Sequence, residues 1–228
     1  KEIQESQVEP ILPKFVDFSK DLYIGETKDK LPLYYKQNTQ NDLFNLVFRY
    51  EFGQQDDNRY DIAAGYLDYV GTDKLTAAEV KQEFYKLACN YSVNVNADNI
   101  NISLSGLQSQ MPEALALLED VVRNAKADQE SYDQYVGLIL KSREDAKTDQ
   151  RTNFSYLINY GIYGEHNALR DNMSEQQLKE ADPQQLLSLI AGLPNLKHSV
   201  LYYGKLTPEE LSETLGAIHQ TAQTLALI

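Results

Sequence analysis

The sequence predicts a single α+β domain in which helices cover a mostly antiparallel sheet. Three observations support this fold class. Hydrophobic residues make up 42% of the 228 residues, which is enough to bury a sizeable core. Apolar residues alternate with polar ones in short segments and recur at helical spacing in longer ones, and no internal repeat divides the chain. We therefore expect one domain over residues 31–228, after a lead-in over residues 1–30.

The lead-in is polar and irregular in sequence, as a linker would be. Prolines interrupt it, and a short run from Phe15 to Phe18 carries aromatic side chains. We expect that run to pack as one aromatic patch. The chain begins with Lys1 rather than methionine, which favours a piece of a longer polypeptide.

Strands are expected where apolar and polar residues alternate. The clearest of them has apolar side chains at every other position from Phe44 to Phe52, and its opposite face is partly apolar as well, at Leu43 and Val47. Apolar residues on both faces are typical of a sheet covered by helices. An Asn-Ala-Asp-Asn turn predicts a hairpin further on. The expected strands are residues 31–36, 42–52, 92–95, 100–104 and 197–203.

Capping signals mark where helices begin. Thr76 and Glu79 form a capping box ahead of an apolar stripe, and Pro112 stands in the first turn of a later helix. Similar signals recur in the second half of the chain. The expected helices are residues 60–70, 76–91, 129–147 and 154–163, with others that begin near Met111, Ser174, Asp182 and Thr207.

Composition excludes several classes of function. The net charge of −13 argues against nucleic acid or an anionic membrane surface as the main partner. No run of about 18 apolar residues is present, so we expect no membrane span. Cys89 is the only cysteine, so no internal disulfide forms, and its place in the expected helix 76–91 favours an inert core thiol.

Residues 65–72 have the spacing of a zinc-binding helix but not its side chains. An inverted zinc-peptidase site has His-x-x-Glu-His on one helix, because residues four apart share a face and hold one metal ion. The corresponding positions here are Gly65, Asp68 and Tyr69. Glycine has no donor atom, a phenol is a poor zinc ligand at neutral pH, and one carboxylate does not make a catalytic zinc site. We expect no catalytic residue, metal or cofactor in this chain.

Several short motifs follow one another along the chain, at residues 38–44, 66–72, 104–107, 111–115, 160–164 and 200–204. No single motif is specific, but their order along most of the chain is. Taken in this order, they resemble the insulinase/pitrilysin (M16) metallopeptidase family. The resemblance is to the zinc-free domain that opens the second half of its long bacterial members, and it extends over residues 33–217.

This resemblance implies the metallohydrolase fold shared by LuxS and the mitochondrial processing peptidase. It also implies a parent protein of two halves, in which the N-terminal half carries zinc and the other half helps to enclose peptide substrate. The zinc-bearing half, in the same polypeptide or in a partner subunit, is then the expected partner. The family's third zinc ligand is a glutamate that would fall near residues 138–146, where Glu144 lies. The bacterial relatives favour the periplasm.

The three histidines do not predict a metal site. His166, His198 and His219 are far apart in sequence, and no two of them have the i+3 or i+4 spacing that brings ligands together on a helix. We expect a loop, a strand and a helix position respectively. Residues 54–58 look like a calcium loop, but they lack alternating oxygen ligands and a closing glutamate.

Tyrosine is frequent, with 16 residues and no tryptophan. Its apolar ring and its hydroxyl suit both a half-buried sheet and a peptide-binding surface. Tyr156, Tyr160 and Tyr163 lie on one expected helix and are our candidates for substrate binding. Leu157 and Ile158 interleave with them, and this pattern favours packing in the core instead.

Three functions remain open from the sequence. The first is a non-catalytic chamber domain of a two-half peptidase, which binds unstructured peptide, with an exposed sheet edge as one means of doing so. The second is a structural subunit that keeps the peptidase fold without hydrolysis, and the third is an independent peptide-binding module. An intact His-x-x-Glu-His motif elsewhere in the polypeptide would favour the first.

Overall fold

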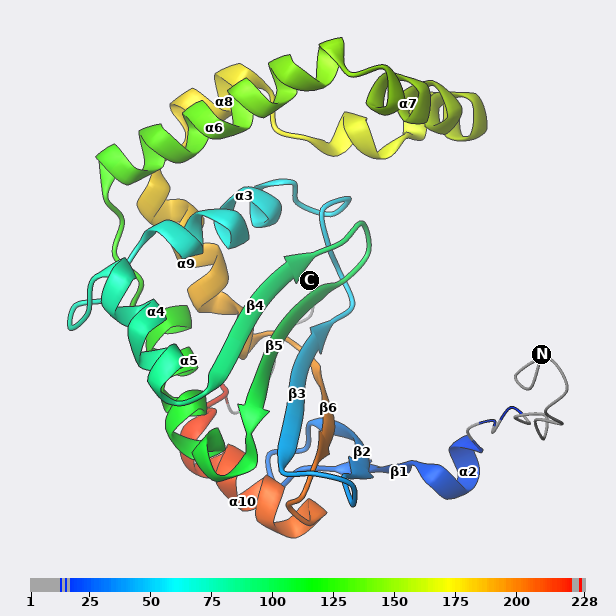
Figure 1. Ribbon diagram of the computed structural model, residues 1–228, viewed down its shortest axis with the longest axis vertical. Coiled ribbons are helices and arrows are strands. Elements are labelled where there is room, and N and C mark those ends of the chain that lie inside the picture. The colour runs from blue at the N-terminus through cyan, green and yellow to red at the C-terminus, as the bar shows by residue number, and fades with distance from the viewer. Residues whose placement is uncertain (1–12, 14, 16, 223–225, 227–228) are drawn as a thin grey trace, which may run out of the picture.

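A computed structural model describes residues 13, 15, 17–222 and 226, and these build one six-stranded sheet (Figure 1). The strands are β1 (Tyr23–Glu26), β2 (Pro32–Gln37), β3 (Leu43–Tyr50), β4 (Cys89–Val95), β5 (Ile100–Leu107) and β6 (Ser199–Gly204). Their order across the sheet is β1-β2-β6-β3-β5-β4. β2 and β6 run parallel, and all other neighbours are antiparallel. The predicted α+β class with a mostly antiparallel sheet is confirmed.

Helices cover one face of this sheet. The described helices are α2 (Phe18–Asp21), α3 (Arg59–Tyr66), α4 (Ala77–Lys86), α5 (Met111–Asn124), α6 (Gln129–Thr148), α7 (Gln150–Tyr163), α8 (Glu175–Glu180), α9 (Pro183–Gly192) and α10 (Pro208–Ile218), and the covering layer consists of α3, α4, α5, α9 and α10. α5 packs on β5, α3 packs against both β4 and α9, and α10 lies beside α5. Figure 1 shows α6 and α7 extending from this layer as an arm.

The alternation along β3 decides which side chains enter the core. Phe44, Leu46 and Phe48 are buried on the face that the helices cover. On the other face Leu43 is exposed and Val47 is half buried. That second face is therefore only partly covered, although its apolar residues favoured a sheet covered on both sides.

The predicted capping signals are confirmed by their hydrogen bonds, whereas the helix expected from residue 154 begins at Gln150. In each capping box the first side chain accepts from a backbone N–H one turn later, and the residue there returns the bond, so two otherwise unpaired N–H groups are satisfied. Asp182 caps α9 by accepting from the backbone of Gln184 and Gln185. The capping boxes pair Thr76 with Glu79, Ser174 with Gln177 and Thr207 with Glu210.

The lead-in contributes to the sheet, because β1 pairs with β2 along its whole length. We did not predict this strand. The expected aromatic patch is wrong for the two aromatic residues that the structure describes, since Phe15 is 84% exposed and Phe18 is 72% exposed. Residues 1–12, 14 and 16 lie outside the described part of the chain.

The helix expected over residues 76–91 ends at Lys86. Ala88 adopts a left-handed conformation with φ of 48°, through which a right-handed helix does not continue, and Cys89 then opens β4. Cys89 is thus a strand residue, and the helical prediction for it is wrong. Its prediction as a core thiol is confirmed, and burial raises the pKa of the thiol.

We expect Gly106→Ala to lower the free energy of unfolding by about 2–3 kcal/mol, measured by urea denaturation. Gly106 lies opposite Cys89 with φ of 155°, where a Cβ atom would come within 2.5 Å of the Ala88 carbonyl oxygen. Gly137→Ala is the control, because a Cβ there meets nothing within 4 Å. This control should raise stability by about 0.5–1 kcal/mol. A Gly106→Ala protein as stable as the original would contradict the prediction.

Candidate functional site

The three positions of the degenerate zinc motif lie at the end of α3 and in the turn after it. Gly65 belongs to α3, whereas Asp68 and Tyr69 belong to a short 3₁₀ helix, η1 (Leu67–Tyr69). Asp68 and Tyr69 are exposed, and Gly65 is half buried. A 3₁₀ helix winds more tightly than an α-helix, so the regular i, i+4 alignment of a pair of metal ligands is not kept.

A cluster of four tyrosines fills the space beside this motif. Tyr66 and Tyr69 come from the motif segment, and Tyr132 and Tyr135 come from α6. Ring centroids lie 5.0 Å apart for Tyr69 and Tyr135, and 5.1 Å apart for Tyr66 and Tyr132. A Cβ atom on Gly65 would collide with the Tyr135 hydroxyl. In this arrangement Tyr135 therefore occupies volume that a side chain at residue 65 would need, and its ring would have to move to admit one.

Burial favours the neutral form of three phenols of the cluster, those of Tyr66, Tyr132 and Tyr135. The Tyr66 hydroxyl donates to the Asp128 carbonyl oxygen at 2.8 Å and accepts from the Asp128 backbone N–H at 2.9 Å. The Tyr132 hydroxyl donates to the Leu178 carbonyl oxygen at 2.8 Å. Burial raises the pKa of Tyr132 to about 12, and burial also raises the pKa of Tyr135. These phenols stay protonated at neutral pH and are poor ligands for zinc.

A groove of about 390 Å³ opens between η1 and α6, and α6 brings no carboxylate to it. Tyr135 and Ser142 are among the α6 residues that line it. Glu144, the expected counterpart of the third zinc ligand, does not line the groove and pairs with Lys147 at 2.6 Å. Among the residues that the structure describes, no three His, Cys, Asp or Glu side chains gather as a metal-binding group. The residues at this place do not fit a zinc ion.

Restoring the motif alone should not create a zinc site. In the triple variant Gly65→His/Asp68→Glu/Tyr69→His, one imidazole would meet the Tyr135 hydroxyl, and α6 would still offer no third ligand to the groove. We expect no stoichiometric zinc at micromolar affinity, measured by competition with a chromogenic chelator. Circular dichroism checks that the variant is folded. Tight, stoichiometric zinc binding would show that the tyrosine cluster leaves room for the metal.

The fold brings two of the three histidines together, which the sequence analysis did not predict. His198 directly precedes β6 and His219 ends α10, and their Nε2 atoms lie 3.0 Å apart. His219 Nδ1 lies 2.5 Å from Glu119 Oε1, and Glu119 Oε2 accepts from Arg123 Nε at 2.7 Å. We call these four residues the histidine chain. His166 belongs to a separate 3₁₀ segment.

The partners of the histidine chain fix its protons. His198 Nδ1 lies 2.7 Å from the Leu196 carbonyl oxygen, which only accepts, so His198 carries its proton on Nδ1 and accepts on Nε2. His219 then donates to His198 from Nε2, and its Nδ1 lies against Glu119 Oε1. Burial lowers the pKa of His198 to about 4, so this ring stays neutral. Each ring nitrogen of the pair has a partner, and Glu119 also forms an ion pair with Arg123.

Burial and nearby charges shift the pKa of the Glu119 carboxylate in opposite directions. Burial alone would raise the pKa of Glu119, but the hydrogen bonds and charges of His219 and Arg123 outweigh it and lower that pKa. Arg123 also donates to the Gln220 carbonyl oxygen. The histidine chain thus ties α5, the end of α10 and the start of β6 together.

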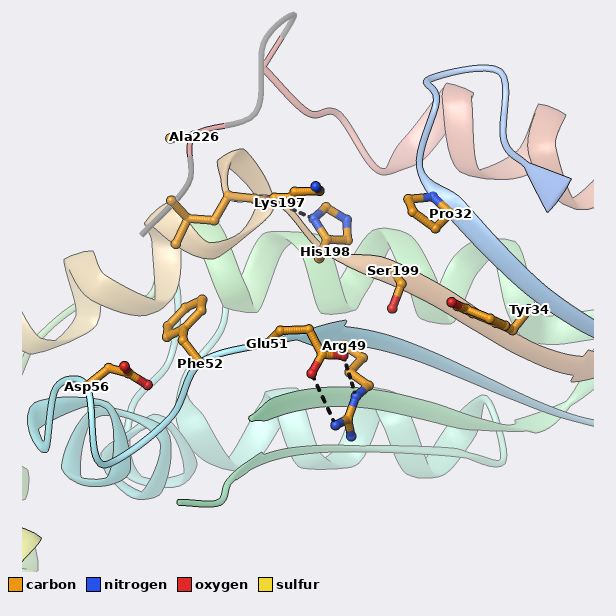
Figure 2. A pocket seen from close by; sticks show the side chains of 11 residues that line it. Pro32, Tyr34, Arg49, Glu51, Phe52, Asp56, Lys197, His198, Ser199 and Ala226 are labelled. Carbon is orange, nitrogen blue, oxygen red and sulfur yellow. Dashed lines mark hydrogen bonds and ion pairs between the residues drawn. The ribbon is translucent and has the colours of Figure 1, made fainter. Parts of the chain in front are cut away.

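A pocket of about 440 Å³ lies beside His198 at one end of the sheet (Figure 2). Tyr34 and Phe52 are among the side chains around it. Arg49 pairs with Glu51 at 2.8 Å, so the charges of these two lining residues compensate each other. The pocket shares no residue with the degenerate motif or the tyrosine cluster, and we assign it no function.

The tyrosines of α7 are not in the core. No residue of α7 is buried, and Tyr156, Tyr160 and Tyr163 are 38%, 57% and 58% exposed. The core interpretation of these residues is therefore wrong. Tyr156 borders a groove of about 400 Å³ together with Arg143 and Lys147 from α6. Substrate binding by the three tyrosines stays a prediction.

Solved structures show which fold this arrangement belongs to. The periplasmic protease PqqL from Escherichia coli matches over 91% of this chain and 24% of its own, with a TM-score of 0.72 and 11% sequence identity. An inactive domain of peptidase M16 from Pseudomonas fluorescens matches over 90% of this chain and 51% of its own, with a TM-score of 0.71 and 16% identity. The fold is that of an M16 peptidase domain.

This M16 fold confirms the family resemblance at the level of structure. The first half of PqqL matches as well, over 92% of this chain and 48% of its own, with a TM-score of 0.69 and 13% identity. The chain thus spans between 24% and 51% of the length of these solved chains. No protein-family model matches the sequence, and no curated protein matches it. No helix among the described residues is both long and apolar enough to cross a bilayer.

Proposed function

We propose that this chain is a non-catalytic domain of an M16-type zinc peptidase, and that it helps to enclose and bind peptide substrate. The tyrosine cluster is the observation that carries the proposal, because it fills the place where a zinc ligand at residue 65 would stand. The inactive M16 domain of the same fold is consistent with it. Zinc and hydrolysis then belong to the N-terminal half of the parent protein or to a partner subunit.

An extended peptide has a place to bind at the edge of the sheet. β4 is the last strand and, within the described residues, pairs with β5 alone. Its outer backbone groups are therefore available to an added strand. α3, which carries Gly65, packs against β4, so a peptide bound there would run beside the degenerate motif.

The tyrosines of α7 offer a second contact for peptide. Tyr156 borders the groove between α6 and α7, and Tyr160 and Tyr163 continue from it along the helix. Exposed tyrosines supply apolar area and a hydroxyl at low entropic cost, as peptide-binding surfaces require. These three residues remain our candidates for substrate binding.

Two other functions use the same fold. A structural subunit would keep the peptidase architecture and bind no peptide, and a stand-alone module would bind peptide without a zinc-bearing partner. A His-x-x-Glu-His motif in the adjoining polypeptide favours our proposal over both. The limited share of PqqL that this chain covers supports a multidomain parent, and the periplasmic location named for PqqL supports the same compartment for it.

Peptide cleavage by the zinc-bearing half, with and without this domain, tests the proposal. We expect the domain to raise kcat/KM for an unstructured peptide about tenfold, equivalent to about 1.4 kcal/mol of transition-state binding. The variant Tyr156→Ser/Tyr160→Ser/Tyr163→Ser should raise KM and leave kcat unchanged. An unchanged rate with both proteins folded would contradict the proposal. Cleavage by this domain alone, abolished by chelators, would contradict its non-catalytic part.

A further inference from the structure

α7 presents two different faces to its surroundings. At 3.6 residues per turn, its three tyrosines fall on one side, Phe154, Ile158 and Ile162 fall on the opposite side, and Leu157 lies between the two sets. The tyrosine side borders the groove with α6 through Tyr156. We call the side of Phe154, Ile158 and Ile162, with Leu157 at its edge, the apolar face.

The apolar face is exposed and uncharged. Its four side chains are between 46% and 66% exposed. No residue between Arg151 and Glu165 carries a charge, in a chain whose net charge is −13. Apolar surface that is free of charges and carries an aromatic residue is typical of the centre of a protein–protein interface. Such a surface favours another protein over a nucleic acid or an ion.

The lack of buried residues in α7 also indicates that a partner packs against this helix. No residue of this 14-residue helix is buried, and its contacts are mainly with α6 and with the short segment that follows it. Helices of about this length are marginally stable in water unless tertiary packing buries one side of them. A partner that covers the apolar face would supply that packing.

We propose that the apolar face of α7 docks against a second domain of the same half-protein. The inference rests on the proposed multidomain parent. This chain covers 48% of the first half of PqqL and 51% of the Pseudomonas fluorescens inactive domain, so each carries a comparable further length in one chain. A covalently attached domain is present at high effective concentration, and one helix face is then enough to hold it. Two copies of this acidic chain would repel each other instead.

Thiol labelling in the parent protein tests this docking. Cys89 is buried, so a cysteine introduced on α7 is the reactive thiol of this chain. Ile162→Cys lies on the apolar face, and Tyr160→Cys is the matched control on the tyrosine side, since the original residues are 66% and 57% exposed. Maleimide labelling is followed by mass spectrometry of the α7 fragment, in the parent and in the 228-residue chain alone.

We expect Ile162→Cys to react about tenfold more slowly in the parent than in the chain alone, because docking protects it, while Tyr160→Cys changes little. Equal rates for Ile162→Cys in the two proteins would overturn the inference. If labelling of Ile162→Cys in the chain alone becomes slower as the protein concentration rises, the face binds a second copy, and this too would overturn the inference. Protection of Tyr160→Cys by added peptide tests the proposed function separately, because a lack of that protection would leave the Ile162→Cys result unchanged.

Discussion

Replacing Glu119 with alanine should lower the free energy of unfolding by about 3–5 kcal/mol. Glu119 bonds both His219 and Arg123 in the histidine chain. Its side chain is 11% exposed and that of His219 is 2% exposed. Without the carboxylate, the charge of Arg123 would lose its ion-pair partner and the buried His219 would lose the partner of its Nδ1. Removing one partner of a buried ion pair costs this much because the remaining charge stays uncompensated.

Chemical denaturation of Glu119→Ala and Glu119→Gln separates the effect of the lost charge from the effect of the lost side-chain volume. Glu119→Gln keeps the shape and one acceptor, so it should lose less than Glu119→Ala, about 1–3 kcal/mol. Glu113→Ala, at an exposed position on the same helix, should stay within about 1 kcal/mol of the original. A Glu119→Ala protein with the original midpoint and the same denaturant dependence would show that the histidine chain does not hold the fold together.

Lowering the pH from 7 to 4 should cost about 3 kcal/mol of stability through His198 alone. The pKa of His198 is lowered by burial from 6.5 to about 4. Between these values the unfolded chain binds a proton that the folded chain refuses, so the free energy of unfolding falls as the pH falls. The lowered pKa of Glu119 also makes the free energy of unfolding fall as the pH falls, since the unfolded carboxylate takes up a proton first. That loss comes in stronger acid than the loss through His198.

Urea titrations at several pH values measure this dependence. His198→Asn removes the titrating ring. Between pH 6.5 and pH 4, the unfolding free energy of this variant should therefore fall by about 3 kcal/mol less than that of the original protein. If His198→Asn and the original protein lose stability in parallel, His198 is not the group that responds.

Local signals in the sequence were sufficient for much of the fold. Thr76 with Glu79 and Thr207 with Glu210 are three residues apart, so their capping boxes depend on neighbours that the sequence shows directly. The alternation along β3 is equally local. By contrast, the end of α4 depends on one residue, Ala88, whose left-handed conformation has no signature in the apolar pattern.

Contacts between distant parts of the chain account for what was missed. His198 and His219 are 21 residues apart and Glu119 is 100 residues from His219, so only the tertiary fold unites them. Tyr132 and Tyr135 share a helical side at i, i+3 in the expected helix 129–147, and this was the one available sign of the tyrosine cluster. Nothing in the sequence showed that they would pack beside Gly65.

The α7 helix shows a different limit of sequence reasoning. Its apolar spacing is typical of a helix that packs against a partner. The pattern does not say whether the partner belongs to the same domain, and we assigned it to the core. The exposure of Tyr160 and Leu157 corrects that assignment.

The pairing of β2 with β6 has a consequence for the order in which this protein is completed during synthesis. β2 has only β1 and β6 as neighbours, and β6 joins it to β3. A nascent chain that has not yet released residues 199–204 from the ribosome therefore holds two separate fragments, β1-β2 and β3-β5-β4. Closure over so long a sequence separation is slow and leaves strand edges unprotected in the meantime. A premature stop before residue 199 should accordingly give an aggregating product and not a smaller folded one.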